Sequence, residues 1–264
     1  MSESAQTYPQ RAVSHGPEIA VAAALLVALG ISAAAGATGP AALLLIAALP
    51  VLFLAFLSEV DRWSDQGAIP LAASLVVSVA VGVLWAVVVN TRPVNDAQAA
   101  AAVVAIPTLL AFAGCWLIHL MHHYDEVLDG FAFSAAIVGG WYLGFLAVVV
   151  VPEALSASSD EGLTWQFLLA IAPTALLLPV AVSASAGVLV ASAWVSRDPG
   201  PQYVQRRWLT SAIVILLGLL VGGVLMPGFA TSVFWLGALA VGAVLIARQS
   251  LRPLLVTAGE TDDG

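Results

Sequence analysis

The chain has 264 residues, of which 61% are hydrophobic and only 9% are charged, and its formal net charge is -8 at pH 7. Soluble domains carry roughly 25% charged residues, and a soluble fold of this size has too little interior to hide so many apolar side chains. The basic residues are eight arginines, with no lysine. This composition argues against a nucleic-acid-binding surface and indicates a protein surrounded by lipid.

Eight apolar stretches approach or reach the length of about 20 residues that a membrane-spanning helix needs. They cover residues 19–35, 41–57, 69–89, 97–120, 131–151, 167–194, 209–226 and 232–247. We therefore predict an all-α, polytopic transmembrane helical bundle of about eight spans. A polar tail at 1–17, which does not have the pattern of a cleavable signal peptide, precedes the transmembrane domain at 18–249, and an acidic tail at 250–264 follows it.

Two features of these stretches predict local geometry. Only the short segment from Gly36 to Pro40 joins the first two, which predicts a tight helical hairpin. The sixth stretch is unusually long and contains Pro173 and Pro179. We interpret it as a single tilted, kinked span, because proline disrupts the helical hydrogen-bond ladder and a long span fits the bilayer by tilting.

The distribution of arginine predicts how the chain is oriented. With a cytoplasmic N-terminus, seven arginines fall in inner segments and only Arg92 falls in an outer loop. Cytoplasmic segments of membrane proteins carry such an excess of positive charge. We therefore expect a multi-pass protein of the cell membrane with both termini in the cytoplasm, the acidic loop at 152–163 outside and the Arg-rich loop at 196–207 inside.

The central parts of the predicted spans contain no Asp, Glu, Lys, Arg or His. Because ionisable groups at bilayer depth mark ion paths, proton relays and metal sites, this pattern disfavours proton-coupled transport and metal-dependent cleavage within the bilayer. The remaining polar side chains are expected to hydrogen-bond to carbonyls of their own helix. They are Ser78, Trp85, Thr108, Ser134, Tyr142, Thr174, Ser183, Ser185 and Ser211. The single cysteine, Cys115, is expected to pack as a small buried residue.

Small residues recur at four-residue spacing in two of the later spans. Ser183, Gly187 and Ala191 follow this spacing in the sixth span, and Gly218 and Gly222 follow it in the seventh. Such spacing lets helix backbones approach closely, so we interpret both sets as helix-packing surfaces.

One dense polar cluster lies between the fourth and fifth spans. It contains His119, His122, His123, Asp125, Glu126 and Asp129. On a continuing helix His119 and His123 share one face at the spacing of helical zinc ligands, and Glu126 is a third candidate ligand. The general base of a zinc-protease helix would be a glutamate at position 120, which is Leu120 here, so that motif is incomplete.

A simpler interpretation of the same cluster is a cytoplasmic turn. Histidines end one helix near its negative pole, and carboxylates begin the next near its positive pole. Asp125 or Asp129 could cap the new helix through free backbone amides. A pH-sensing role for the three imidazoles is a further alternative.

Two segments resemble the PrsW-type intramembrane protease family. The segment DEVLDGFAFSAAIVGGWYLGF resembles that family's DE-P-x-DG-x-x-Y-G-A-x-x-G-x-G-F signature. Earlier, LPVLFLAFLSEVDRW is similar to the family's second span, which ends in an Asp-Arg-aromatic motif, here Asp61-Arg62-Trp63. The order of the two motifs and a bundle of about eight spans also fit the family, and the resemblance covers residues 49–145.

The resemblance implies a metal-dependent intramembrane protease related to the CAAX-processing enzymes. The family carries a Glu-Glu-x-x-Lys motif, a later glutamate and two later histidines. By spacing, the glutamate pair would fall near Pro107 and Thr108 and the later glutamate near Gly144, and no histidine follows His123. Hydrolysis needs an activated water and a group that moves its proton, so none of the family's catalytic residues is carried over to this chain.

Three hypotheses follow from these patterns. The first is a non-catalytic, PrsW-like scaffold or regulator that binds membrane lipid and other transmembrane proteins and needs no cofactor. The second is an active zinc-dependent protease whose displaced site uses the cluster from His119 to Asp129. The third is a small-solute permease or a subunit of an export complex, which would require a polar cavity between the spans.

Overall fold

The computed structural model describes residues 16–60, 68–91, 96–120, 127–156, 161–195, 206–225 and 233–260. Within these segments the backbone is almost entirely helical and contains no strand, which confirms the all-α prediction for this part of the chain. The elements are α1 (Gly16–Ala34), α2 (Thr38–Val60), α3 (Ala68–Thr91), α4 (Asp96–His119), α5 (Val127–Ser156), α6 (Glu161–Ala172), η1 (Pro173–Leu177), α7 (Leu178–Val195), α8 (Arg206–Leu225) and α9 (Val233–Glu260).

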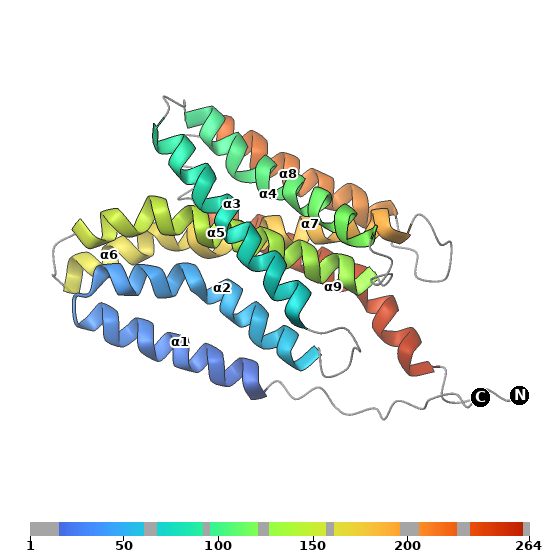
Figure 1. The fold of residues 1–264 in the computed structure, drawn as a ribbon, viewed down its shortest axis with the longest axis horizontal. Helices are drawn as coiled ribbons and strands as arrows, with labels where there is room; N and C mark the ends of the chain where they lie inside the picture. Colours follow the sequence, from blue (N-terminus) through green and yellow to red (C-terminus); the bar gives the residue numbers. More distant parts are fainter. Residues whose placement is uncertain are drawn as a thin grey trace, which may run out of the picture.

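Successive helices run in alternating directions through one bundle (Figure 1). Helices α2, α4, α7 and α9 end on the right in this view, where α1 begins, whereas α1, α3, α5 and α8 end on the left. The first and the last helix therefore begin and end at the same side of the bundle. Short connections between sequential apolar helices favour such antiparallel neighbours.

Five helical segments are long and apolar enough to cross a membrane. They are Ile69–Thr91, Ala101–Ile118, Gly130–Ser156, Leu163–Ala193 and Trp208–Leu225. Three shorter apolar helices, Ile19–Ala34, Thr38–Leu52 and Phe234–Ser250, correspond to the other three predicted spans. A multi-pass, membrane-embedded bundle is thus supported, while the number of eight spans remains a prediction.

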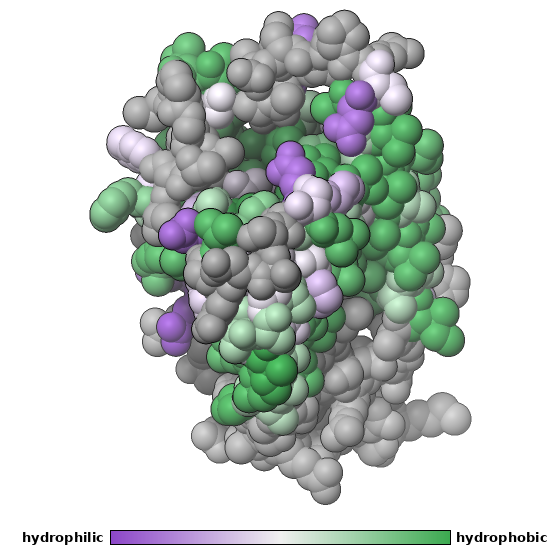
Figure 2. All heavy atoms as spheres, turned by 90° about the vertical axis from the view of Figure 1, so that its left-hand side faces the viewer, coloured by the Kyte–Doolittle hydropathy of each residue, from purple (hydrophilic) through white to green (hydrophobic). Residues whose placement is uncertain are grey.

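The outer surface has the hydropathy that a bilayer requires. Large apolar side chains are exposed on several helices, such as Ile69 at 81%, Leu109 at 66% and Leu225 at 70%. Figure 2 views the left-hand end of Figure 1, and there hydrophilic side chains are scattered over the end face while hydrophobic ones cover the right-hand flank. Apolar flanks with polar side chains at an end are typical of a membrane-embedded bundle.

The first two helices form the predicted tight hairpin. Gly36 adopts a positive φ of 69° immediately after α1. The N–H of Gly36 donates to the carbonyl of Ala33 and the N–H of Ala37 donates to that of Ser32, at 3.0 and 2.8 Å. These two bonds define a Schellman motif, which uses glycine because other residues are strained at positive φ. The tight hairpin is thereby confirmed, but its turn is shorter than the predicted Gly36–Pro40 segment, because α2 already begins at Thr38.

Replacing Gly36 by alanine is expected to destabilise the hairpin by about 1 kcal/mol, because a Cβ disfavours the left-handed conformation. The measurement is the unfolding free energy in mixed micelles. Gly30→Ala is the matched control, because a Cβ at Gly30 in α1 meets no atom within 4 Å. Equal stability of the two variants would contradict the role of the positive φ.

The long sixth stretch is one continuous helical run with a local change of winding. Residues Leu163–Ala193 form a single apolar run, and the turn Pro173–Leu177 within it is π-helical. The N–H of Leu178 donates to the carbonyl of Pro173, five residues earlier. Pro173 has no N–H and so cannot donate the usual helical hydrogen bond to the carbonyl four residues earlier. The α-helical hydrogen-bond pattern is interrupted there, and a wider π-helical turn follows. The prediction of one continuous run is confirmed, and its tilt and kink remain predictions.

Helix α5 forms the centre of the bundle. It contacts α2, α3, α4 and α7, and its most extensive contact is with α3. In Figure 1 it runs through the middle of the bundle, with α3 crossing it. Its spanning segment is 67% buried, whereas those of α3, α4 and α8 are each 22% buried. Helix α9 continues to Glu260, so the backbone stays helical over most of the expected acidic tail.

Candidate functional site

The predicted metal ligands lie at the junction between α4 and α5. His119 is the last residue of α4, but its side chain is outside the described part of the structure, as are His123 and Glu126 entirely. His122 and Asp125 also lie outside the described residues. Where side chains are described, no group of three or more His, Cys, Asp or Glu occurs. The zinc site and the capping turn therefore remain predictions, as does the role of the motif Asp61-Arg62-Trp63, which also lies outside the described residues.

Glycines create an unusually close crossing between α3 and α5. A Cβ added at Gly140 would lie 2.5 Å from the carbonyl oxygen of Leu75, and one added at Gly144 would collide with the carbonyl oxygen of Val79. From the other side, a Cβ at Gly82 would collide with the carbonyl oxygen of Trp141. The backbones therefore touch directly, as small-xxx-small interfaces in membranes do. Sequence reasoning missed this crossing, although Gly140 and Gly144 have the spacing that it sought elsewhere.

The two small-residue sets singled out from the sequence behave differently. Gly187 in α7 packs against the Phe131 ring of α5, whose Cδ2 would lie 2.5 Å from an added Cβ. Gly187 is thus confirmed as a packing position, although against a ring and not a backbone; Ala191 is also buried, while Ser183 lines a cavity. At Gly218 in α8 the packing is looser than expected, because an added Cβ would meet only the Cδ2 of Leu239 in α9 at an ordinary 3.7 Å, whereas Gly222 is buried.

Tyr142 connects α5 to α4 through a hydrogen bond between helices. Its Oη donates to the carbonyl oxygen of Val103 at 2.7 Å. Val103 stands four residues before Pro107, which has no N–H and leaves that carbonyl without its usual helical donor. The phenol thus supplies the missing donor, as neighbouring helices commonly do around proline in membranes. The expectation that Tyr142 bonds within its own helix is wrong.

Aromatic side chains fill the centre of the bundle beside the glycine crossing. Trp141 is fully buried and stacks on Phe145 with ring centroids 5.0 Å apart and planes 7° apart. Its ring also meets that of Tyr142 edge to face, at 5.1 Å and 87°. Offset-stacked and edge-to-face pairs are the favourable aromatic geometries. The large rings and the glycines share the short stretch of α5 at residues 140–145. Together they fix the position of α5 against α3 and α4.

The small hydroxyl groups only partly follow the sequence expectation. The Thr108 hydroxyl donates to the carbonyl of Val104 in its own helix, at 2.8 Å, as predicted. In contrast, five buried polar atoms among the described side chains have no hydrogen-bond partner. They are Nε1 of Trp85 and Trp141 and Oγ of Ser134, Ser183 and Ser185. Buried polar groups without partners are few in native proteins. Each of these five atoms therefore departs from the expectation of a hydrogen bond to a carbonyl of its own helix.

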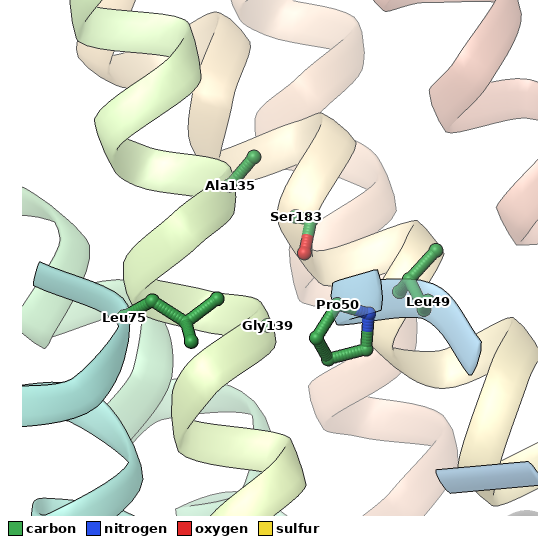
Figure 3. A pocket seen from close by; sticks show the side chains of 6 residues that line it. All are labelled: Leu49, Pro50, Leu75, Ala135, Gly139 and Ser183. Atoms are coloured by element: carbon green, nitrogen blue, oxygen red, sulfur yellow. The ribbon is translucent and has the colours of Figure 1, made fainter. Parts of the chain in front are cut away.

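A cavity of about 60 Å³ lies next to one of these groups. It is lined by Leu49 and Pro50 of α2, Leu75 of α3, Ala135 and Gly139 of α5, and Ser183 of α7. In Figure 3 the Ser183 hydroxyl points from α7 toward the Pro50 ring. Ligand sites for drug-sized molecules measure roughly 300–1,000 Å³, so this cavity holds only a small group.

The cysteine is confirmed as a packing residue. Cys115 is 1% exposed, and its Sγ lies 3.7 Å from the carbonyl oxygen of Gly130 in α5. This contact places a small side chain where the start of α5 approaches α4. It also shows why a reagent cannot readily reach this thiol.

The fold and these contacts define a multi-pass, all-α, membrane-embedded bundle organised around a central helix. No family model, curated protein or solved structure matches this chain.

Proposed function

We propose that this protein is a non-catalytic membrane scaffold or regulator that holds transmembrane helices of other proteins. It crosses the cell membrane about eight times with both termini in the cytoplasm. The alternating helix directions in Figure 1 support this topology, because the ends that border the Arg-rich segments lie at one side of the bundle. The resemblance to the PrsW-type proteases supports descent from a helical scaffold that once held a substrate helix.

The observation that carries this proposal is the packing at the positions where the resemblance expects catalytic glutamates. Gly144 touches the α3 backbone so closely that even a Cβ would collide with the Val79 carbonyl. Pro107 is buried, and the Thr108 hydroxyl is bonded to Val104. These positions thus make packing contacts, and a glutamate at Gly144 would separate α3 from α5.

The cavity lined by described residues favours binding at the outer surface over binding within the bundle. A cavity of about 60 Å³ with almost entirely apolar walls is too small for a peptide segment and does not favour a polar solute path. The helices α3, α4 and α8, in whose spanning segments only 22% of the residues are buried, offer apolar surface to a neighbouring transmembrane helix. Helix pairs in lipid associate through such close van der Waals packing.

The test compares membranes of source cells with and without this chain. A scaffold is expected to stabilise its partner, so the partner's abundance falls on deletion and returns equally with the wild type, His119→Ala and His123→Ala. A protease gives the opposite result, because its substrate accumulates on deletion and the histidine variants do not reverse this. Metal analysis is the second readout, and stoichiometric zinc lost in His119→Ala or His123→Ala, but kept in the control His15→Ala, overturns the proposal.

The topology gives a separate prediction, tested by cysteine labelling. The single native cysteine, Cys115, is buried and is expected to contribute little labelling of its own. A membrane-impermeant maleimide is expected to label Asp160→Cys in intact cells, because this residue belongs to the acidic outer loop. Gln202→Cys, in the Arg-rich inner loop, should react only after the membrane is opened. The reverse pattern would invert the orientation.

A further inference from the structure

The cavity between α2, α3, α5 and α7 is kept open by a glycine. A Cβ added at Gly139 meets no atom within 4 Å, whereas one added at the adjacent Gly140 would lie 2.5 Å from the Leu75 carbonyl. The close α3–α5 contact therefore lies directly beside an empty space. Protein interiors pack densely with few voids larger than a water molecule. We therefore expect another molecule to fill this space.

The cavity lies where α2 and α3 both pack on α5. These two helices make few contacts with each other, although both pack on α5. Pro50 and Leu75 line the cavity, and the residues that follow them, Val51 and Val76, are exposed at 37% and 64%. In a membrane-embedded bundle this seam faces hydrocarbon. A lateral route from the bilayer to the cavity would therefore pass between these two helices.

The walls select an apolar occupant. The Ser183 hydroxyl is the polar side-chain group among the six lining residues, and it has no hydrogen-bond partner. A buried water typically needs two to four polar partners, so a single hydroxyl does not hold one. A hydrocarbon chain, in contrast, gains dispersion contacts with every wall of a void that is otherwise unfilled.

We propose that this cavity binds a segment of one lipid acyl chain, which enters from the bilayer between α2 and α3 and lies over Gly139. Gly139 provides the space, and Leu49, Pro50, Leu75, Ala135 and Ser183 line it. The bound chain fills the seam that direct α2–α3 packing leaves open. This inference rests on membrane embedding alone and is independent of the proposed scaffold role.

The test is photolabelling of the full-length protein in phosphatidylcholine vesicles that contain a phosphatidylcholine with a diazirine in one acyl chain. Mass spectrometry is expected to find Leu49, Pro50 and Leu75 labelled above the exposed Leu26 of α1. Gly139→Leu fills the cavity and should abolish this excess. Gly30→Leu is the matched control, because it also places a leucine in open space, and it should keep the excess.

Two results would overturn the proposal. One is a wild type in which the α2–α3 positions are labelled no more than Leu26. The other is undiminished labelling of these positions in a folded Gly139→Leu protein. Ser183→Val fills the cavity from α7 and serves as the second variant if Gly139→Leu does not fold. Even without either variant, the wild-type labelling of the α2–α3 positions relative to Leu26 decides the question.

Discussion

Gly144→Ala is expected to destabilise the bundle by about 2–3 kcal/mol, at the upper end of the cost of inserting a methyl group into a packed core. The added Cβ collides with the Val79 carbonyl, and a backbone atom cannot rotate out of the way as a side chain can. Gly140→Ala is expected to act in the same direction through the Leu75 carbonyl. The measurement is the unfolding free energy in mixed micelles, followed by tryptophan fluorescence.

Gly139→Ala provides the matched control within the same helix. Its Cβ meets open space, so only the better helix propensity of alanine remains, and the variant should be unchanged or up to about 1 kcal/mol more stable. The contrast between neighbouring glycines thus separates close packing from propensity. If Gly139→Ala and Gly144→Ala change stability equally, the α3–α5 crossing does not depend on its glycines.

Tyr142→Phe is expected to cost about 1–2 kcal/mol, because it leaves the part-buried Val103 carbonyl without a donor. In Pro107→Ala the backbone N–H at position 107 restores the helical bond to Val103. Tyr142→Phe should therefore cost clearly less in the Pro107→Ala background than in the wild type. This double-mutant cycle isolates the coupling between the two positions.

The control for this cycle is Tyr203→Phe, in the loop expected at 196–207, which should leave stability unchanged in both backgrounds. Equal costs of Tyr142→Phe with and without Pro107 would contradict the interpretation. In that case the phenol would stabilise the bundle by packing beside Trp141, and its bond to Val103 would contribute little.

The sequence by itself determined the helices and several of their ends. In lipid every backbone polar group must be satisfied within the chain, so each long apolar stretch is obliged to form a helix. The turn at Gly36 and the interruption at Pro173 were also predictable, because both depend on local backbone chemistry. The His119–Glu126 cluster was located by composition alone, and its geometry remains a prediction.

Only the tertiary structure decided which helix is central and which small residues matter. Lipid chains are as apolar as a protein core, so hydropathy cannot distinguish the buried α5 from the exposed α3. The same spacing gives a backbone contact at Gly140 and Gly144 but open packing at Gly218. Likewise, the partner of Tyr142 is a carbonyl freed by Pro107 in another helix. These outcomes depend on which faces meet, and a pattern within one helix does not contain that information.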